Sequence, residues 1–346
     1  MKVQFGTHVR FYSVYYAAAL VGLFSAMLLS CELLQEDIFP ASFGQELAVL
    51  DLGNLKRAAG VPDTAMVWEP WYVPVPQHNK QFLVVPLHQF SAPSALALLD
   101  ARSLTLLKTF SNIPMGPFAL LDMDGYLATG NGQTLVRINP VTLEVVEAPL
   151  VPNPPIDFAR AGFTAQNGET PYTYLVGFDE TGIKLQAFDS KWIADSTGTN
   201  DKIFSEQPAS QFVLQDLLYD GSRVFLALTD TMSQSSYILR WNSLQDFIEA
   251  FNSTEADFLA FNADRVIKIN LPEEKGLRLS TKGYFIRLHD KVEKLVRYDL
   301  EGDNRVLDSF VLPNNFRGRA GVFSDGSAWC LYDEQKNTLQ LLRPWW

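Results

Sequence analysis

The stretch LVRINPVTLEVV, residues 135–146, is the clearest copy of a pattern that repeats through most of the chain. An apolar strand ends at Asn139, and a second apolar stretch begins four residues later. Asn and Asp favour such turns because their side chains accept hydrogen bonds from backbone amides just ahead in the chain. The stretch therefore predicts two antiparallel strands joined by a tight turn.

Five copies of this strand-and-turn unit lie inside the chain. Each has Leu or Ile four residues before a closing Asp or Asn, and the copies end at Asp100, Asn139, Asp189, Asn242 and Asp299. Successive copies lie 39, 50, 53 and 57 residues apart, and an outlying copy, LAVLD, ends at Asp51. The spacing is that of a repeated supersecondary unit.

A second strand precedes each of these units. Four copies begin at a turn glycine, Gly125, Gly221, Gly283 or Gly326, and two more are FLVVPLH (82–88) and YLVGFD (174–179). Glycine suits this place because a two-residue hairpin turn needs a positive φ angle. The two units together predict an all-β chain built from repeated four-stranded antiparallel meanders.

A meander of this size is the blade of a β-propeller. The last copy, from Arg319, supplies three strands, and the strand at 47–51 is left over. If that strand docks as the outer strand of the last blade, six blades close and two sheet edges are hidden. If it begins a further blade, there are seven and one is incomplete. The strand count favours six.

The residues around Asn139 resemble the repeats of YVTN and quinoprotein-like propellers. The resemblance extends from Phe82 to about Arg343. It implies an architecture and no activity.

Two segments interrupt the repeat. Residues 243–252 place apolar side chains at helical spacing after Ser243, which predicts a short amphipathic helix with a serine N-cap. Residues 62–76 contain Trp68, Trp71 and Tyr72 among four prolines, and we expect them to connect the N-terminal strand to the first blade.

The N-terminus has the pattern of an export signal. Lys2 and Arg10 precede an apolar run at 17–29, and LLSC closes it at Cys31. The tetrapeptide resembles the bacterial lipobox, which implies a diacylglyceryl group on Cys31 and cleavage after Ser30. The domain scheme is then a signal peptide at 1–30, a lipidated tether at 31–45 and a propeller at 46–346.

A transmembrane helix is the alternative for this segment, because residues 11–29 approach the spanning minimum of about 20 residues. Glu32, Glu36 and Asp37 follow directly, without a basic flank, which favours the lipoprotein. The expected address is the cell envelope, on its periplasmic or surface face. Glu32 after the cysteine favours the outer membrane under the enteric sorting rule.

The net charge limits the classes of partner that we expect, and the cysteine content limits the covalent links. Beyond residue 31 the chain has 26 basic and 39 acidic residues, a balance that disfavours nucleic acid. Cys31 and Cys330 are the two cysteines, so lipidation of the first leaves no intrachain disulfide. Cys330 lies in an apolar strand, and we expect a buried, inert thiol.

The sequence contains no P-loop, dinucleotide fingerprint, HExxH, CxxC or GxSxG motif. His78, His88 and His289 are far apart, so no metal site or cofactor is predicted. The run Asp122-Met123-Asp124-Gly125 lacks the later acids of an EF-hand and indicates a hairpin turn.

Two candidate binding regions remain. The second strands of the blades end on one rim, which gives a candidate ring at His88, Asn131, Asp179, Asp230, Asp290 and Asp333. Such a ring would bind a cation or a basic partner, although Asx residues also simply suit turns. Trp68, Trp71 and Tyr72, together with Trp345 and Trp346, form a candidate aromatic patch near the ring closure.

Two functions follow from these features. The first is a lipid-anchored, non-enzymatic scaffold that binds a protein partner in the envelope. The second is a lactonase-like or glycan-acting propeller enzyme with a metal or acidic site in its central channel, for which Asp122, Asp157 and Asp216 are candidate acids. The scaffold is favoured, and the sequence indicates no oligomeric state.

Overall fold

Short antiparallel strands make up most of the residues that the computed structural model describes. The structure describes residues 45–88, 94–113, 118–131, 133–146, 150–153, 159–178, 182–193, 200–203, 212–230, 233, 235–252, 263–269, 274–289, 293–301, 305–312 and 316–344. The predicted signal peptide, Cys31 and nearly all of the tether lie outside these ranges, as do Asp157, Asp179, Asp290, Trp345 and Trp346. Residues Glu46–Leu342 form one compact unit.

The described strands form six sheets, of which five are built from consecutive segments and the sixth also takes in the N-terminal strand. The first contains β2 (Met66–Val67), β3 (Trp71–Val75), β4 (Lys80–His88), β5 (Ala95–Asp100) and β6 (Leu106–Ser111). The second contains β7 (Phe118–Leu121), β8 (Leu127–Gly130) and β9 (Leu135–Ile138). The third contains β10 (Ala161–Asn167), β11 (Thr170–Phe178), β12 (Gly182–Phe188) and β13 (Asn200–Ile203).

The remaining sheets have four strands each. The fourth contains β14 (Phe212–Tyr219), β15 (Val224–Asp230), β16 (Ser235–Trp241) and β17 (Arg265–Ile269). The fifth contains β18 (Glu274–Ser280), β19 (Gly283–His289), β20 (Glu293–Tyr298) and β21 (Val306–Val311). The sixth contains β22 (Gly318–Val322), β23 (Trp329–Asp333), β24 (Thr338–Leu342) and β1 (Glu46–Asp51).

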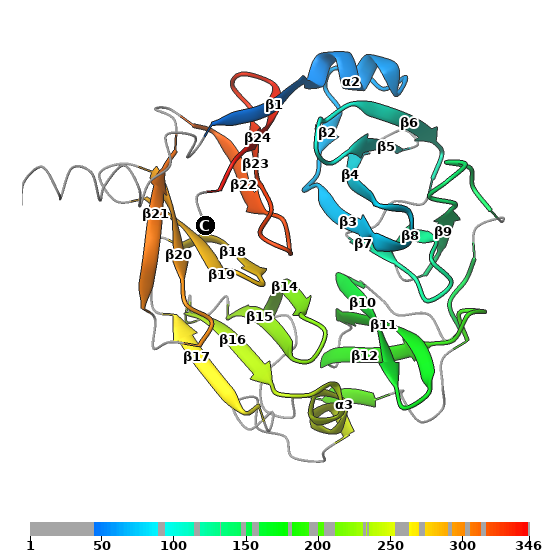
Figure 1. Ribbon diagram of the computed structural model, residues 1–346, viewed down its shortest axis with the longest axis vertical. Helices are drawn as coiled ribbons and strands as arrows, with labels where there is room; N and C mark the ends of the chain where they lie inside the picture. The colour runs from blue at the N-terminus through cyan, green and yellow to red at the C-terminus, as the bar shows by residue number, and fades with distance from the viewer. Residues whose placement is uncertain are drawn as a thin grey trace, which may run out of the picture. The chain divides into compact units, whose positions relative to one another are not determined.

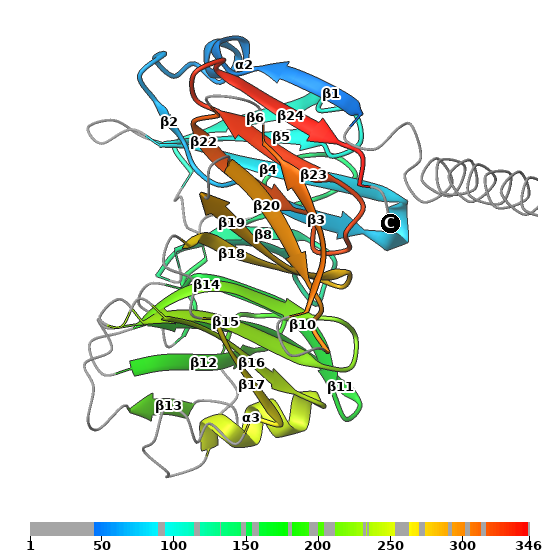
Figure 2. The ribbon, with the colours of Figure 1, turned by 90° about the vertical axis from the view of Figure 1, so that its left-hand side faces the viewer.

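These sheets are the blades of a six-bladed β-propeller and are arranged in a ring (Figure 1). The prediction of an all-β, six-bladed ring is confirmed. Strand β1 pairs antiparallel with β24, so the N-terminal strand completes the last blade as the strand count indicated (Figure 2). The second blade has three described strands, which isolated bridges at Val145 and Leu150 extend outward.

The predicted turn chemistry is present. Gly125 and Gly221 have φ angles of 80° and 99°, which only glycine adopts readily. The Asn139 side chain accepts hydrogen bonds from the amides of Val141 (2.8 Å) and Thr142 (3.1 Å), as the Asx-turn interpretation requires. Asp100 and Asp189 close their strands in the same way.

Two expectations for the N-terminal part need correction. Asp51 ends a strand, but it caps helix α2 (Leu52–Ala58) through the amide of Asn54 (2.7 Å) instead of starting a hairpin. The segment at 62–76 is more than a connection, because it contains β2 and β3, which both pair with β4. These two short strands take the innermost position of the first blade.

The hydrophobic core lies between neighbouring blades. One buried cluster joins Leu83 and Val85 of the first blade to Leu339 and Leu341 of the sixth, and Leu55 of α2 covers it. Four further clusters fill the other interfaces from the first blade to the fifth. The side chain of Trp329 packs edge-to-face on Phe310 between the fifth and sixth blades. Each interface therefore packs sheet on sheet.

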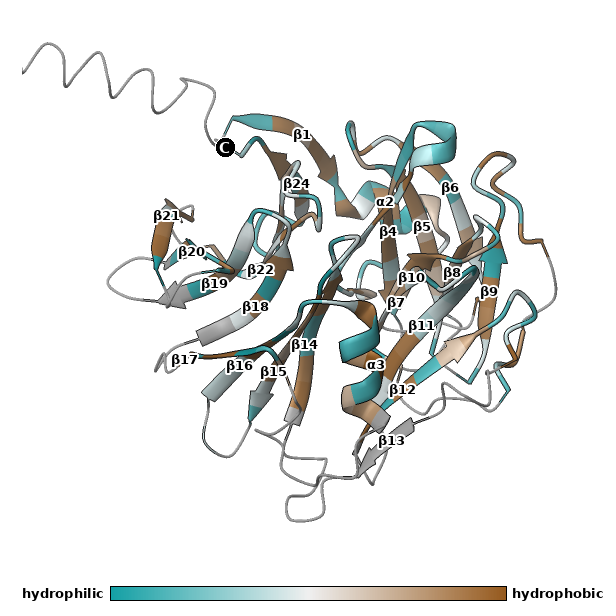
Figure 3. Ribbon diagram, turned by 60° about the horizontal axis from the view of Figure 1, so that its bottom comes forward, coloured by the Kyte–Doolittle hydropathy of each residue, from teal (hydrophilic) through white to brown (hydrophobic). Residues whose placement is uncertain are grey.

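The predicted amphipathic helix is α3 (Leu244–Asn252), which follows β16 in the fourth blade. The Ser243 hydroxyl accepts the amide of Asp246 (3.1 Å), which confirms the serine cap. Its apolar side chains, including Phe247 and Phe251, are buried against the third and fourth blades, and Figure 3 shows its hydrophobic and hydrophilic sides. In the part of the chain that the structure describes, no helix is long and apolar enough to cross a membrane.

Candidate functional site: the central cavity

A cavity of about 480 Å³ lies at the centre of the ring. The innermost strands of all six blades line it, and representative residues are Tyr72, Ala119, Gly162, Asp216, Arg278 and Gly321. Cavities of this volume hold small organic ligands. The propeller therefore has one shared site to which every blade contributes.

An interruption of the innermost strand of the first blade forms one wall. Strand β2 stops at Val67 and β3 starts at Trp71, so Trp68, Glu69 and Pro70 form a break at the edge of the sheet. Pro70 has no amide hydrogen to donate, and proline is found at such edges for that reason. The break places Glu69 in the cavity lining.

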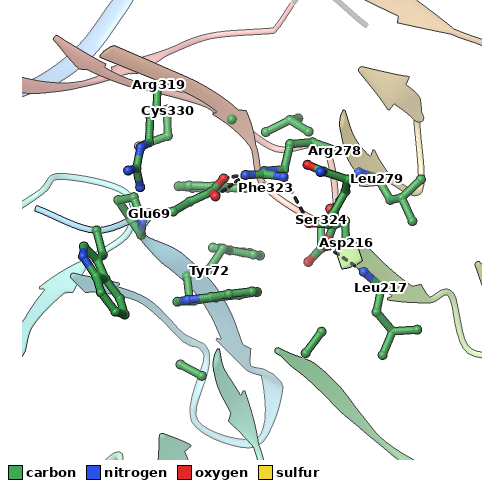
Figure 4. A pocket seen from close by; sticks show the side chains of 18 of the residues that line it. Glu69, Tyr72, Asp216, Leu217, Arg278, Leu279, Arg319, Phe323, Ser324 and Cys330 are labelled. Carbon is green, nitrogen blue, oxygen red and sulfur yellow. Dashed lines mark hydrogen bonds and ion pairs between the residues drawn. The ribbon is translucent and has the colours of Figure 1, made fainter. Parts of the chain in front are cut away.

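Glu69 forms an ion pair with Arg278 of β18, which is 209 positions away in the sequence (Figure 4). The pair is bidentate, because Arg278 Nε donates to Glu69 Oε1 and Nη2 donates to Oε2. Arg278 Nη1 also donates to the carbonyl oxygens of Gln215 (3.1 Å) and Leu277 (2.8 Å). One guanidinium group thus links the first, fourth and fifth blades.

Asp216 is the second acid in the cavity. Its position follows a bulge in β14, and its carboxylate accepts the amides of Leu217 (2.8 Å) and Leu279 (2.8 Å). Burial raises the pKa of Asp216 to about 6, although the nearby Arg278 charge and the two amides act in the opposite direction. Figure 4 shows Asp216 on the side of the cavity opposite Glu69.

The structure brings the three predicted aromatic residues together. Trp68, Trp71 and Tyr72 all line the cavity. The Tyr72 ring stacks on Phe323 at 4.3 Å, and its hydroxyl donates to Asp325 Oδ2 (2.6 Å). Burial, with the Asp325 carboxylate, raises the pKa of Tyr72 and keeps its hydroxyl protonated. The Trp68 ring lies 4.7 Å from the His88 ring.

The rim candidates lie where the second strands end, and their described side chains build turns. The Asn131 side chain accepts the amides of Gln133 and Thr134, and the Asp333 carboxylate accepts those of Gln335 and Lys336. Asp230, which is 7% exposed, accepts the Ser233 hydroxyl at 2.7 Å. His88 contacts the Ser94 hydroxyl. Turn formation accounts for these positions, and binding by the rim stays a prediction.

Asp122, another candidate acid, is not in the cavity lining. It is 3% exposed, and Arg137 Nε donates to its carboxylate at 2.7 Å. The same carboxylate accepts the amides of Asp124 and Tyr126, which makes this run the predicted hairpin turn. Of Asp122 and Asp216, the two candidate channel acids that the structure describes, Asp216 lies in the cavity lining.

Cys330 lies in the cavity wall with an 8% exposed side chain, which confirms the expected buried thiol. Burial, helped by the Glu69 charge, raises its pKa to about 12. A thiol with this pKa stays protonated at neutral pH and is a poor nucleophile. The residues that the structure describes contain no group of three or more His, Cys, Asp or Glu side chains placed to hold a metal ion.

Sequence reasoning missed Glu69, Arg278, Arg160 and Arg319, all of which line the cavity. None of them belongs to a motif, and the partners Glu69 and Arg278 are far apart in the chain. The Glu-Pro dipeptide at 69–70 was the one available signal, because proline in a strand marks an edge or a break.

No family model matches the sequence, and no curated protein matches it. Similar solved structures include the Dos1 propeller (10% identity, 77% of this chain and 76% of that chain, TM-score 0.45) and the Neurospora crassa Pan2 WD40 domain (10%, 86% and 94%, 0.45). A third is the Myceliophteria thermophila Cps50 (Swd1) β-propeller domain (8%, 82% and 99%, 0.45). These similarities concern architecture, and the described sheets themselves establish the propeller.

Proposed function

We propose that this chain is a cell-envelope lipoprotein, anchored through Cys31, whose propeller is a non-enzymatic binding scaffold. The binding role rests on one observation: both acids of the cavity already accept hydrogen bonds from groups of the protein itself. Glu69 is held by the Arg278 guanidinium, and Asp216 by two backbone amides. The anchor rests on the LLSC motif at 28–31.

Acid–base catalysis needs a carboxyl group within hydrogen-bond reach of a substrate proton. In this cavity the oxygens of Glu69 and Asp216 already accept hydrogen bonds from groups of the fourth and fifth blades. Carboxylates used in this way fix the positions of the blades around the cavity. A cavity that is rigid before the ligand arrives loses less entropy on binding, which favours recognition.

A propeller enzyme of the lactonase-like or glycan-acting kind is the second candidate. Asp216 favours it, because a carboxyl pKa of about 6 suits a general acid or base near neutral pH. Hydrolysis of the lactone dihydrocoumarin by the full chain, with loss of the rate in Asp216→Asn, would support this candidate against the scaffold.

The anchor is tested by metabolic labelling with a fatty-acid analogue and by intact mass in a bacterial host. Cys330→Ala is the matched control for Cys31→Ala, since it removes the other cysteine. We expect labelled, membrane-bound wild type and Cys330→Ala, and unlabelled Cys31→Ala. Equal labelling of all three, or none, would contradict the anchor.

The scaffold is tested by site-specific photo-crosslinking in the same cells. A crosslinker at Val213, which lines the cavity and is 39% exposed, is compared with one at Val306 on the outer strand β21, which is 54% exposed. We expect a discrete envelope protein to be captured from position 213 and not from 306. Identical products from both positions would contradict binding at the cavity face.

A further inference from the structure

Arg160, just before β10 of the third blade, and Arg319, in β22 of the sixth, are two arginines of the cavity lining. Both line the cavity and both are exposed, and neither pairs with a carboxylate among the residues that the structure describes. Other arginines, such as Arg137, Arg240 and Arg297, have acidic partners. Two free guanidinium groups in one cavity are a feature of recognition, because each can bind an anion through paired N–H donors.

The charge balance of the cavity opposes that of the whole chain. The chain carries a formal net charge of −11, whereas the cavity lining contains three arginines and two acids. One arginine, Arg278, neutralises Glu69, so the charges of Arg160 and Arg319 outweigh the single charge of Asp216. The cavity is therefore a local site for anions on an acidic protein.

The cavity wall beside Arg319 is aromatic and leaves room for a ligand. Trp68 and Trp71 line the cavity, and Tyr332 pairs with Arg319 across strands β22 and β23. Gly321 adds space, because a Cβ atom there would meet nothing closer than Glu69 Oε1 at 4.0 Å. In Figure 4 Arg319 lies on the same side of the cavity as Glu69.

We propose that the central cavity binds a small ligand that combines a carboxylate with an aromatic group, that Arg319 holds the carboxylate, and that the charge of Arg160 on the facing third blade adds to the attraction. The aromatic part packs on the tryptophan-lined wall and over Gly321. This inference goes beyond the proposed binding of a protein partner, because it concerns a small ligand inside the same cavity.

The test compares two probes that differ in one charge, N-acetyl-L-tryptophan and its amide. Calorimetric titration of the full chain in detergent measures the Kd of each. We expect the acid to bind at least about 10-fold more tightly than the amide, because charge-assisted hydrogen bonds to arginine are lost with the carboxylate. Arg319→Gln should remove most of that preference, and Arg160→Gln should remove a smaller part of it.

Two further variants separate specific binding from general effects. Arg57→Gln removes an exposed arginine of α2 outside the cavity lining and should leave both Kd values unchanged. Gly321→Val places a strand-compatible side chain in the open space and should weaken both probes together. Circular dichroism verifies that each variant keeps its fold.

Three outcomes would overturn the inference: equal binding of acid and amide, no binding of either, or an effect of Arg57→Gln equal to that of Arg319→Gln. The scaffold proposal would survive these results, because labelling at Cys31 and crosslinking at Val213 test it separately.

Discussion

The ring is closed twice, and the two closures differ in kind. On the outside, β1 completes the sixth blade through a backbone ladder with β24, in which Val49 faces Gln340 and Leu50 faces Leu339. Inside, Glu69 and Arg278 connect two innermost strands through a single pair of side chains. The first closure uses a whole strand, and the second uses one ion pair.

The difference indicates that the outer closure contributes mainly to stability and the inner closure mainly to the shape of the cavity. A ladder buries apolar side chains and pairs backbone groups, so it contributes to the free energy of unfolding along its whole length. An ion pair between groups that are 22% and 31% exposed contributes less, but it fixes the position of specific atoms. We infer that the outer closure holds the ring together and that the inner one shapes the cavity.

The largest expected effect comes from breaking the outer ladder. The Leu52 amide donates to Asn337 (2.9 Å), and inward-facing amides alternate along an antiparallel strand, so the Leu50 amide also faces β24. Leu50→Pro removes that hydrogen bond and a side chain that packs on the core, and should lower the free energy of unfolding by about 2–3 kcal/mol.

Val49→Pro is the matched control, because Val49 is 45% exposed and its amide faces away from β24. Urea titration of the full chain measures both variants. If Val49→Pro costs as much as Leu50→Pro, the register of this closure is wrong.

The outer closure could be predicted from the sequence, and the reason is physical. Apolar strands that close with Asp or Asn recur five times inside the chain, so the additional copy at 47–51 is expected to pair with a free sheet edge. The helix after Asp51 was missed because the same residue suits both a hairpin turn and a helix N-cap.

The inner closure could not be predicted from the sequence. Glu69 and Arg278 leave no periodic signal, and only the curvature of the ring brings them together. The aromatic residues at 68, 71 and 72 were found because their composition is unusual, although their place on the innermost strand was not foreseen.

A smaller effect is expected in the pH dependence of the free energy of unfolding, and it arises from Asp216 in the cavity. Burial raises the pKa of Asp216 from its ordinary 3.8 to about 6, so the folded protein binds this proton more tightly than the unfolded chain. The resulting stabilisation is fully present below pH 3.8 and is lost as the pH rises through 6. We expect a loss on the order of 1 kcal/mol over this window.

Asp216→Asn isolates this contribution, because the variant cannot titrate at this position. The difference in the free energy of unfolding between wild type and variant, measured by urea titration from pH 4 to pH 7, should fall as the pH rises. A difference that is constant or rises with pH would show that the carboxyl is not buried as described.

The most direct test of the inner closure is a double-mutant cycle on Glu69→Gln and Arg278→Met. The free energy of unfolding is measured for wild type, both single variants and the double variant of the full chain. The pair of Lys336 and buried Asp333, in which the lysine is 55% exposed and the separation is 3.7 Å, serves as the reference and should give a coupling near zero. We predict a coupling of about 1–2 kcal/mol between Glu69 and Arg278. If the effects of Glu69→Gln and Arg278→Met on the free energy of unfolding are additive, the claim that this ion pair fixes the positions of the two innermost strands is wrong.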